Sequence, residues 1–146
     1  MTTKISFGLL AVMIVLVVLS LLLGQQIIYQ GLIVPRLPEH QSVPMWWWLG
    51  VVGPYYLVCF IVGSKLRTWS EFFVYSISAV LVSQVYDFMA AGLHQPGYLK
   101  SFAVESPLYF WTVGTFFNWL GVAIAFGIGM YLGKKFKLWE PRNGTA

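Results

Sequence analysis

Charged residues are scarce in this sequence. Asp, Glu, Lys and Arg make up only 10% of the 146 residues, whereas soluble globular domains carry about 25%. So few charges cannot cover the surface of a water-soluble globule, and hydrophobic residues make up 58% of the chain. A bilayer removes the need for a charged surface, because helix surfaces that face lipid are apolar. The composition therefore indicates an integral membrane protein.

Cysteine and recognisable catalytic motifs are also nearly lacking. Cys59 is the single cysteine, which excludes an intrachain disulfide and a cysteine-based metal cluster. The sequence has no phosphate-binding loop, serine-hydrolase elbow or zinc-protease motif. His40 and His94 lack metal-ligand spacing, and the basic residues form no continuous stripe that would follow a phosphate backbone. We therefore predict no metal site and no nucleic-acid partner. Whether His40 and His94 bind a metal stays open, and the cofactor is unknown.

Four apolar segments are present, and each is long enough to cross the hydrocarbon core as a helix of about 20 residues. They cover approximately 5–34, 45–63, 70–91 and 108–132. The apolar run of the first segment exceeds the roughly 7–15 residues of a signal-peptide core, and no small-x-small cleavage site follows it. We therefore expect it to be retained. The sequence predicts a single all-α domain over 1–146, a bundle of four transmembrane helices with short loops.

The distribution of Lys and Arg predicts the orientation of this bundle. Seven basic residues flank the first span, fill the second loop or follow the fourth span: Lys4, Lys65, Arg67, Lys134, Lys135, Lys137 and Arg142. The first and third loops contain only Arg36 and Lys100. Basic residues close to span ends stay in the cytoplasm. Both termini are therefore expected to be cytoplasmic, in a protein of the cell (inner) membrane.

Polar side chains gather at one depth of the predicted bundle. They come late in the first and third spans and early in the second and fourth, which places all of them in the outer half. The inner halves are almost purely apolar. We therefore predict a polar and aromatic site in the outer half, whose residues lie at this depth or at its outer rim. The candidate binding residues are Gln26, Gln30, Tyr55, Gln84, His94, Trp111 and Asn118.

Helical periodicity indicates which faces meet. In the third span, Ser76, Val80, Ser83, Asp87, Ala90 and His94 recur at spacings of three and four, which is one helix face. In the fourth span, Gly114, Asn118, Gly121, Ala125 and Gly129 form a stripe of small residues suited to close helix contact. Asp87 and Asn118 are therefore expected to lie on facing surfaces. Pro54 is expected to kink the second span.

Asp87 is the only acidic residue well inside a predicted span, and no Lys or Arg lies in any span. A charge at the bilayer centre costs roughly 2.5–3.5 kcal/mol on insertion scales, so an intramembrane acid is by default a functional hypothesis. The alternatives are a purely structural hydrogen bond between helices and hydration near the interface. We expect a partner for Asp87 from another helix, with Asn118, Gln26, Gln30 and Tyr55 as the candidates.

Three functions are compatible with this sequence. The first is a non-catalytic protein that binds a lipophilic small molecule in the outer half, or a subunit of a larger membrane complex. Such a subunit would contact other membrane proteins or a second copy through Gly121, Ala125 and Gly129. The second is a small membrane enzyme that acts on a lipophilic substrate, with Asp87 as catalytic proton donor or acceptor. The third is a proton- or cation-coupled carrier. The bilayer itself is the expected surrounding in all three.

Overall fold

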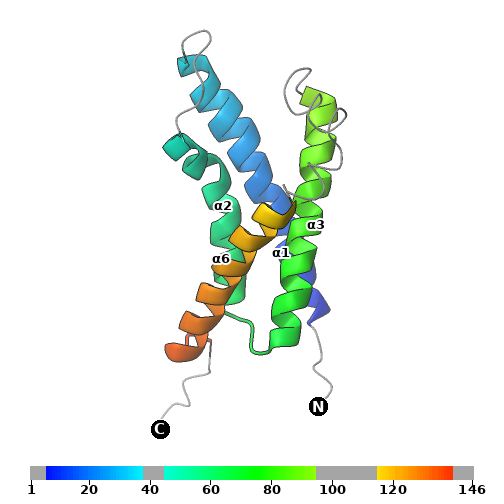
Figure 1. Cartoon of the computed structure of the whole chain (residues 1–146), viewed down its shortest axis with the longest axis vertical. Helices are drawn as coiled ribbons and strands as arrows, with labels where there is room; N and C mark the ends of the chain where they lie inside the picture. Colours follow the sequence, from blue (N-terminus) through cyan, green and yellow to red (C-terminus); the bar gives the residue numbers. More distant parts are fainter. Residues whose placement is uncertain (1–5, 38–44, 95–114, 140–146) are drawn as a thin grey trace.

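The computed structural model describes residues 6–37, 45–94 and 115–139 (Figure 1). Within these ranges the chain is helical between its turns and contains no strand, which confirms the all-α prediction. The elements are α1 (Phe7–Leu22), η1 (Leu23–Ile33), η2 (Val34–Arg36), α2 (Met45–Gly63), α3 (Trp69–His94) and α6 (Thr115–Lys135). The predicted bounds of the second segment are those of α2. Residues 108–114 of the fourth predicted segment lie outside the described ranges.

Two helices in the described part are long and apolar enough to cross a membrane. One is the continuous helix Phe7–Arg36, of 30 residues, which comprises α1, η1 and η2. The other is α6, of 21 residues, and a shorter apolar helix covers Leu49–Gly63. A span requires about 20 apolar residues. These helices support association with a membrane.

The first helix begins as an α-helix and widens into a π-helix. The Ser6 hydroxyl caps its start by accepting a hydrogen bond of 3.3 Å from the Leu9 N–H. From Leu23 onward each turn is wider, and at its end the Val34 N–H donates to the carbonyl of Tyr29, five residues earlier. The glutamines of the first predicted span lie in this π-helix. Because π-helical turns are rare and are frequently found at functional sites, η1 is a candidate region for such a site.

The helices α2 and α3 are shaped by local sequence signals. Pro54 lies inside α2 and removes a backbone donor there, and Figure 1 shows α2 bent toward its N-terminal end. The turn before α3 is a capping box. The Thr68 hydroxyl accepts the Glu71 N–H at 3.2 Å, and the Glu71 carboxylate accepts the Thr68 N–H at 2.9 Å. This reciprocal pair satisfies donors that the first helical turn leaves free.

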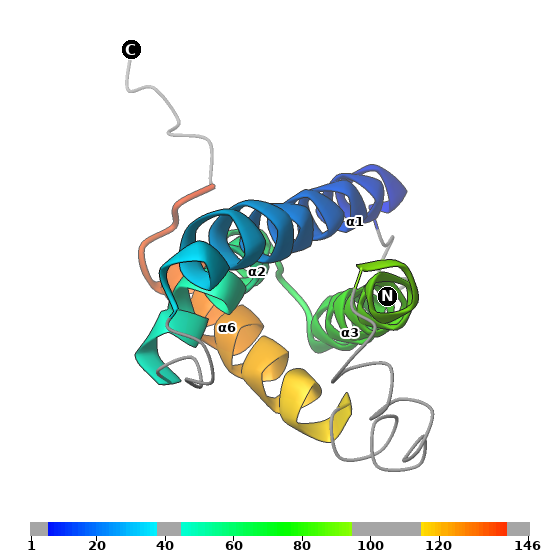
Figure 2. The same cartoon turned by 90° about the horizontal axis from the view of Figure 1, so that it is seen from above.

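In the bundle, α2 and α3 occupy opposite corners, with α1 and α6 between them (Figure 2). The helices α2 and α6 approach each other closely. A methyl group added at Gly63 would lie 2.7 Å from the Phe126 carbonyl oxygen, and one at Gly129 would overlap the Phe60 carbonyl. Only glycine permits such an approach of two backbones. The predicted small-residue stripe of the fourth span therefore contacts α2 of the same chain.

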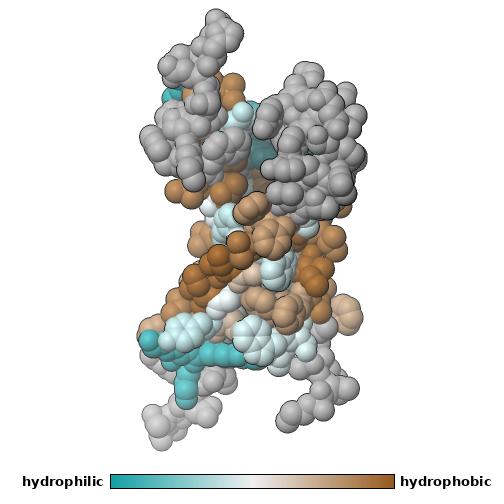
Figure 3. All heavy atoms as spheres, viewed as in Figure 1, coloured by the Kyte–Doolittle hydropathy of each residue, from teal (hydrophilic) through white to brown (hydrophobic). Residues whose placement is uncertain are grey.

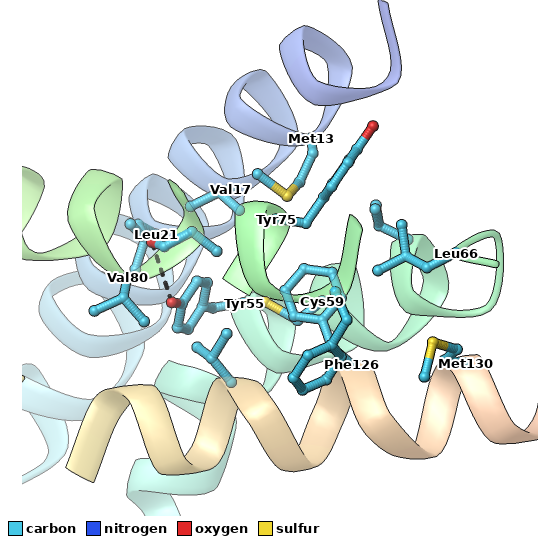
Figure 4. Close-up of a cluster of buried hydrophobic side chains, with 14 residues drawn as sticks. Met13, Val17, Leu21, Tyr55, Cys59, Leu66, Tyr75, Val80, Phe126 and Met130 are labelled. Carbon is cyan, nitrogen blue, oxygen red and sulfur yellow. Dashed lines mark hydrogen bonds between the residues drawn. The ribbon is translucent and has the colours of Figure 1, made fainter. Parts of the chain in front are cut away.

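The core is formed by buried side chains from all four helices, and Figure 4 shows them converging between the ribbons. It includes Met13 and Val17 of α1, Tyr55 and Cys59 of α2, Tyr75 and Ala79 of α3, and Val122 and Phe126 of α6. The Tyr75 hydroxyl also donates to the Ser6 carbonyl at 2.9 Å, which ties α3 to the start of α1. The core thus fixes the four helices relative to one another and positions the polar residues beyond it.

Candidate functional site

Asp87 is held by a glutamine of the π-helix. The Gln25 side-chain amide donates a hydrogen bond of 2.7 Å to Oδ1 of Asp87, and both side chains are partly buried. Asp87 lies about 27 Å along α3 from Trp69, at 1.5 Å of rise per residue. The sequence predicts a partner from another helix, and the structure supplies one. However, that partner is Gln25, which is not among the predicted candidates.

A second polar cluster joins three helices below Asp87. The Asn118 amide donates to the Ser83 hydroxyl at 2.6 Å, and the Tyr55 hydroxyl lies 3.3 Å from the same oxygen. Ser83 in turn donates to the Val80 carbonyl at 2.9 Å. The Tyr55 hydroxyl is also 3.3 Å from the Ala79 carbonyl oxygen and 3.4 Å from Asn118 Oδ1.

This Tyr55–Ser83–Asn118 cluster satisfies its own hydrogen bonds. The Ser83 oxygen uses its proton on a backbone carbonyl and has two lone pairs, which suffice for both incoming donors. The cluster contains no carboxyl, imidazole or amine that would exchange protons at neutral pH. It therefore acts as a structural junction of α2, α3 and α6. Tyr55 and Asn118, predicted as ligand-binding residues, are brought together here.

Gln84 differs from that cluster because one of its buried polar atoms has no hydrogen-bond partner within the described structure. Its side chain is only 5% exposed, and its carbonyl oxygen Oε1 has no hydrogen-bond partner within the described structure. Leaving a buried acceptor unpaired costs about 1–3 kcal/mol. Gln84 lies three residues before Asp87 on α3, so the unpaired oxygen and the acid are one helical turn apart. This pair, together with Gln25, forms the candidate site.

The other predicted site residues divide into two groups. Gln26 lies within hydrogen-bonding range of the Tyr86 hydroxyl, which joins η1 to α3 a second time, and Gln30 is half-buried on η1. Trp111 lies outside the described residues, and so does the side chain of His94 at the end of α3. The site that the structure describes is therefore formed by η1 and α3.

The polar groups of this site are two side-chain amides and one carboxyl. No group of three His, Cys, Asp or Glu side chains that could hold a metal ion occurs within 6–37, 45–94 and 115–139. Amide groups donate and accept hydrogen bonds without titrating. The arrangement of Gln25, Gln84 and Asp87 is thus suited to binding a polar group by hydrogen bonds.

Comparison with known proteins gives no further assignment: the chain matches no protein family, no characterised protein and no solved structure.

Proposed function

We propose that this chain is a four-span protein of the cell (inner) membrane that binds a lipophilic molecule in its outer half. The polar end of that molecule would contact Gln25, Gln84 and Asp87. The observation that carries the proposal is the buried Gln84 carbonyl oxygen, one turn from Asp87, to which none of the described residues donates a hydrogen bond. A bound O–H or N–H group would supply that donor.

The outward faces of all four helices support the transmembrane arrangement. Large apolar side chains in the middle of each helix are more than half exposed: Val15 57%, Leu57 57%, Leu81 56% and Ile124 54%. In water such a surface would drive aggregation, whereas lipid tails are a matching environment for it. α3, at 26 residues, has ample length for a span.

The distribution of charge supports the proposed orientation. Five of the basic residues in the described ranges lie in or just after the last turns of α2 and α6: Lys65, Arg67, Lys134, Lys135 and Lys137. Only Arg36 lies at the end of the first helix. The first group is at the lower end of Figure 1, where α2 ends, α3 begins and α6 ends. Because basic flanks favour the cytoplasm, that end is assigned to the cytoplasm and η1 to the outer half.

The site favours binding over the two alternative functions. An enzyme that uses Asp87 for proton transfer would be expected to place a second titrating group beside it, whereas the hydrogen-bond partner observed is the amide of Gln25, which does not titrate. A carrier would need a polar path through the inner half. That region is instead filled by Met13, Cys59 and Phe126, all fully buried.

The proposal predicts a ligand that remains bound during gentle purification. The full chain is purified in mild detergent, extracted with organic solvent, and the extract is analysed by mass spectrometry. Wild type should retain a lipophile with a hydroxyl or N–H group, near one molecule per chain. Asp87→Asn and Gln84→Leu should lose it, while Ser76→Ala, a buried control on the same helix, should keep it. Identical extracts from wild type and both site variants would refute the proposal.

A further inference from the structure

Exposed basic side chains gather at the end of the bundle opposite η1. Lys65 and Arg67 lie in the turn between α2 and α3, and Lys134, Lys135 and Lys137 at the end of α6. Figure 3 shows hydrophilic colour concentrated at this lower end, below an apolar belt. We call these five residues the basic cluster. Glu71 is the one acid near it in the described ranges, so the local formal charge is five minus one, or +4.

Glu71, the acid in this region, already accepts two backbone hydrogen bonds. The Glu71 carboxylate accepts backbone N–H groups of Arg67 at 2.8 Å and of Thr68 at 2.9 Å, as part of the cap of α3. It therefore holds the start of α3 in place, and its negative charge is already included in the local formal charge of +4. The cluster remains strongly positive toward whatever faces it.

Aromatic rings are interleaved with the basic cluster in a fixed arrangement. The Lys65 Nζ lies 4.2 Å from the centroid of the Trp139 ring, and the Trp139 indole N–H donates to the Ser64 hydroxyl at 2.9 Å. Lys135 Nζ lies 5.7 Å from the centroids of both Tyr131 and Phe136. Trp139 thus joins the end of α6 to the end of α2 and brings cations from both helices to one side.

We propose that this end of the bundle binds the headgroups of anionic phospholipids. A phosphodiester is an acceptor for several ammonium groups, and basic residues at a membrane surface attract anionic lipid. At least half of the surface of Tyr131, Phe136 and Trp139 is exposed. Such rings suit the interfacial region of a bilayer, where aromatic residues are enriched. A free phosphate would use the cations and leave those rings in water, so the lipid is the better ligand. This inference needs the transmembrane arrangement but not the Gln84–Asp87 site.

The test measures lipid selectivity around the full chain in bilayers. Spin-labelled phosphatidylglycerol and phosphatidylcholine are compared in proteoliposomes, and the motionally restricted fraction gives their relative association constant. Wild type should prefer phosphatidylglycerol at least threefold at low salt, and less at high salt as screening increases. The triple variant Lys65→Gln/Lys134→Gln/Lys135→Gln should bring the ratio close to one. The matched Lys→Arg triple and Arg36→Gln should keep the wild-type ratio.

Three results would overturn the inference. A wild-type ratio of one, or an unchanged ratio in the Gln triple, would show that the basic cluster does not recognise the headgroup. Loss of the preference on addition of millimolar inorganic phosphate at constant ionic strength would show a site for free phosphate instead. The proteoliposomes are first floated on a gradient: a chain that stays behind refutes the transmembrane arrangement itself, and this inference with it.

Discussion

The amide of Gln25 and the carboxyl of Asp87, 62 positions apart in sequence, are joined by a hydrogen bond of 2.7 Å between η1 and α3. No Lys or Arg lies in the predicted spans, so this amide takes the place of a counter-charge. The bond also helps to define where the candidate site lies. It fixes the acid beside Gln84, whose carbonyl oxygen is buried without a partner in the described structure.

The first prediction concerns the worth of that bond. Gln25→Leu should lower the free energy of unfolding by about 1–2 kcal/mol, because it leaves a partly buried acid without its donor. Gln25→Leu/Asp87→Leu should recover most of the loss, since replacing both partners by apolar groups removes the unmet need as well. A denaturation series in detergent of the single and double variants measures the coupling energy. Strict additivity of the two changes would show that the bond contributes nothing.

The second prediction separates ligand binding from stability at Gln84. In ligand-free protein, Gln84→Leu should raise the free energy of unfolding by about 1 kcal/mol, because it removes a buried acceptor that has no donor. The same variant should lose the bound lipophile. Mass spectrometry of the purified preparations tests binding, and thermal melting after the lipophile has been removed by delipidation tests stability. A variant that is destabilised and still binds would mean that Gln84 is satisfied within the chain.

The third prediction concerns the contact of α2 with α6. Gly129→Ala should lower the melting temperature, because its methyl group would overlap the Phe60 carbonyl oxygen. Gly127→Ala is the matched control two residues earlier. Its methyl group would have only an ordinary contact of 3.9 Å with the Phe72 ring. It should be neutral or stabilising by up to about 1 kcal/mol, the helix-propensity gain of Ala over Gly. Equal effects of the two variants would contradict this close crossing.

Helix positions, and the choice of Asp87 as a candidate site residue, can be predicted from the sequence because both depend on local pattern. Apolar runs define the segments, and an acid without a counter-charge in such a run is conspicuous. The hydrogen-bond partner of Asp87 is harder to predict from the sequence. Depth along the first span does not distinguish Gln25 from Gln26 and Gln30, and the five-residue hydrogen bonding of η1 changes the directions in which its glutamines point. Gln25, rather than Gln26 or Gln30, therefore reaches the Asp87 carboxyl.

Pairings between distant helices are also beyond a single sequence. The small residues Gly121 and Gly129 predict a close contact but not the helix that makes it. In the structure they lie against Tyr56 and Phe60 of α2. Contact of this stripe with another subunit stays an untested prediction. Conversely, Thr68-Trp69-Ser70-Glu71 is a capping-box pattern that can be recognised in the sequence and that marks the start of α3.

The last prediction tests the orientation on which the outer-half site depends. Single cysteines are placed at Arg36 and at Arg67, two exposed positions at opposite ends of the bundle, in a Cys59→Ala background that removes the buried native thiol. Ser64, in the same turn as Arg67, would be a poor labelling site, because it is only 4% exposed and its hydroxyl accepts a hydrogen bond from Trp139. An impermeant maleimide added to intact cells should label the cysteine at 36 and leave that at 67 unreacted until the membrane is opened. This follows because basic flanks are retained in the cytoplasm. Labelling of position 67 alone would show that the bundle has the opposite orientation, with the Gln25–Asp87 site in the cytoplasmic half. Labelling of both positions in sealed cells would show that no membrane separates positions 36 and 67.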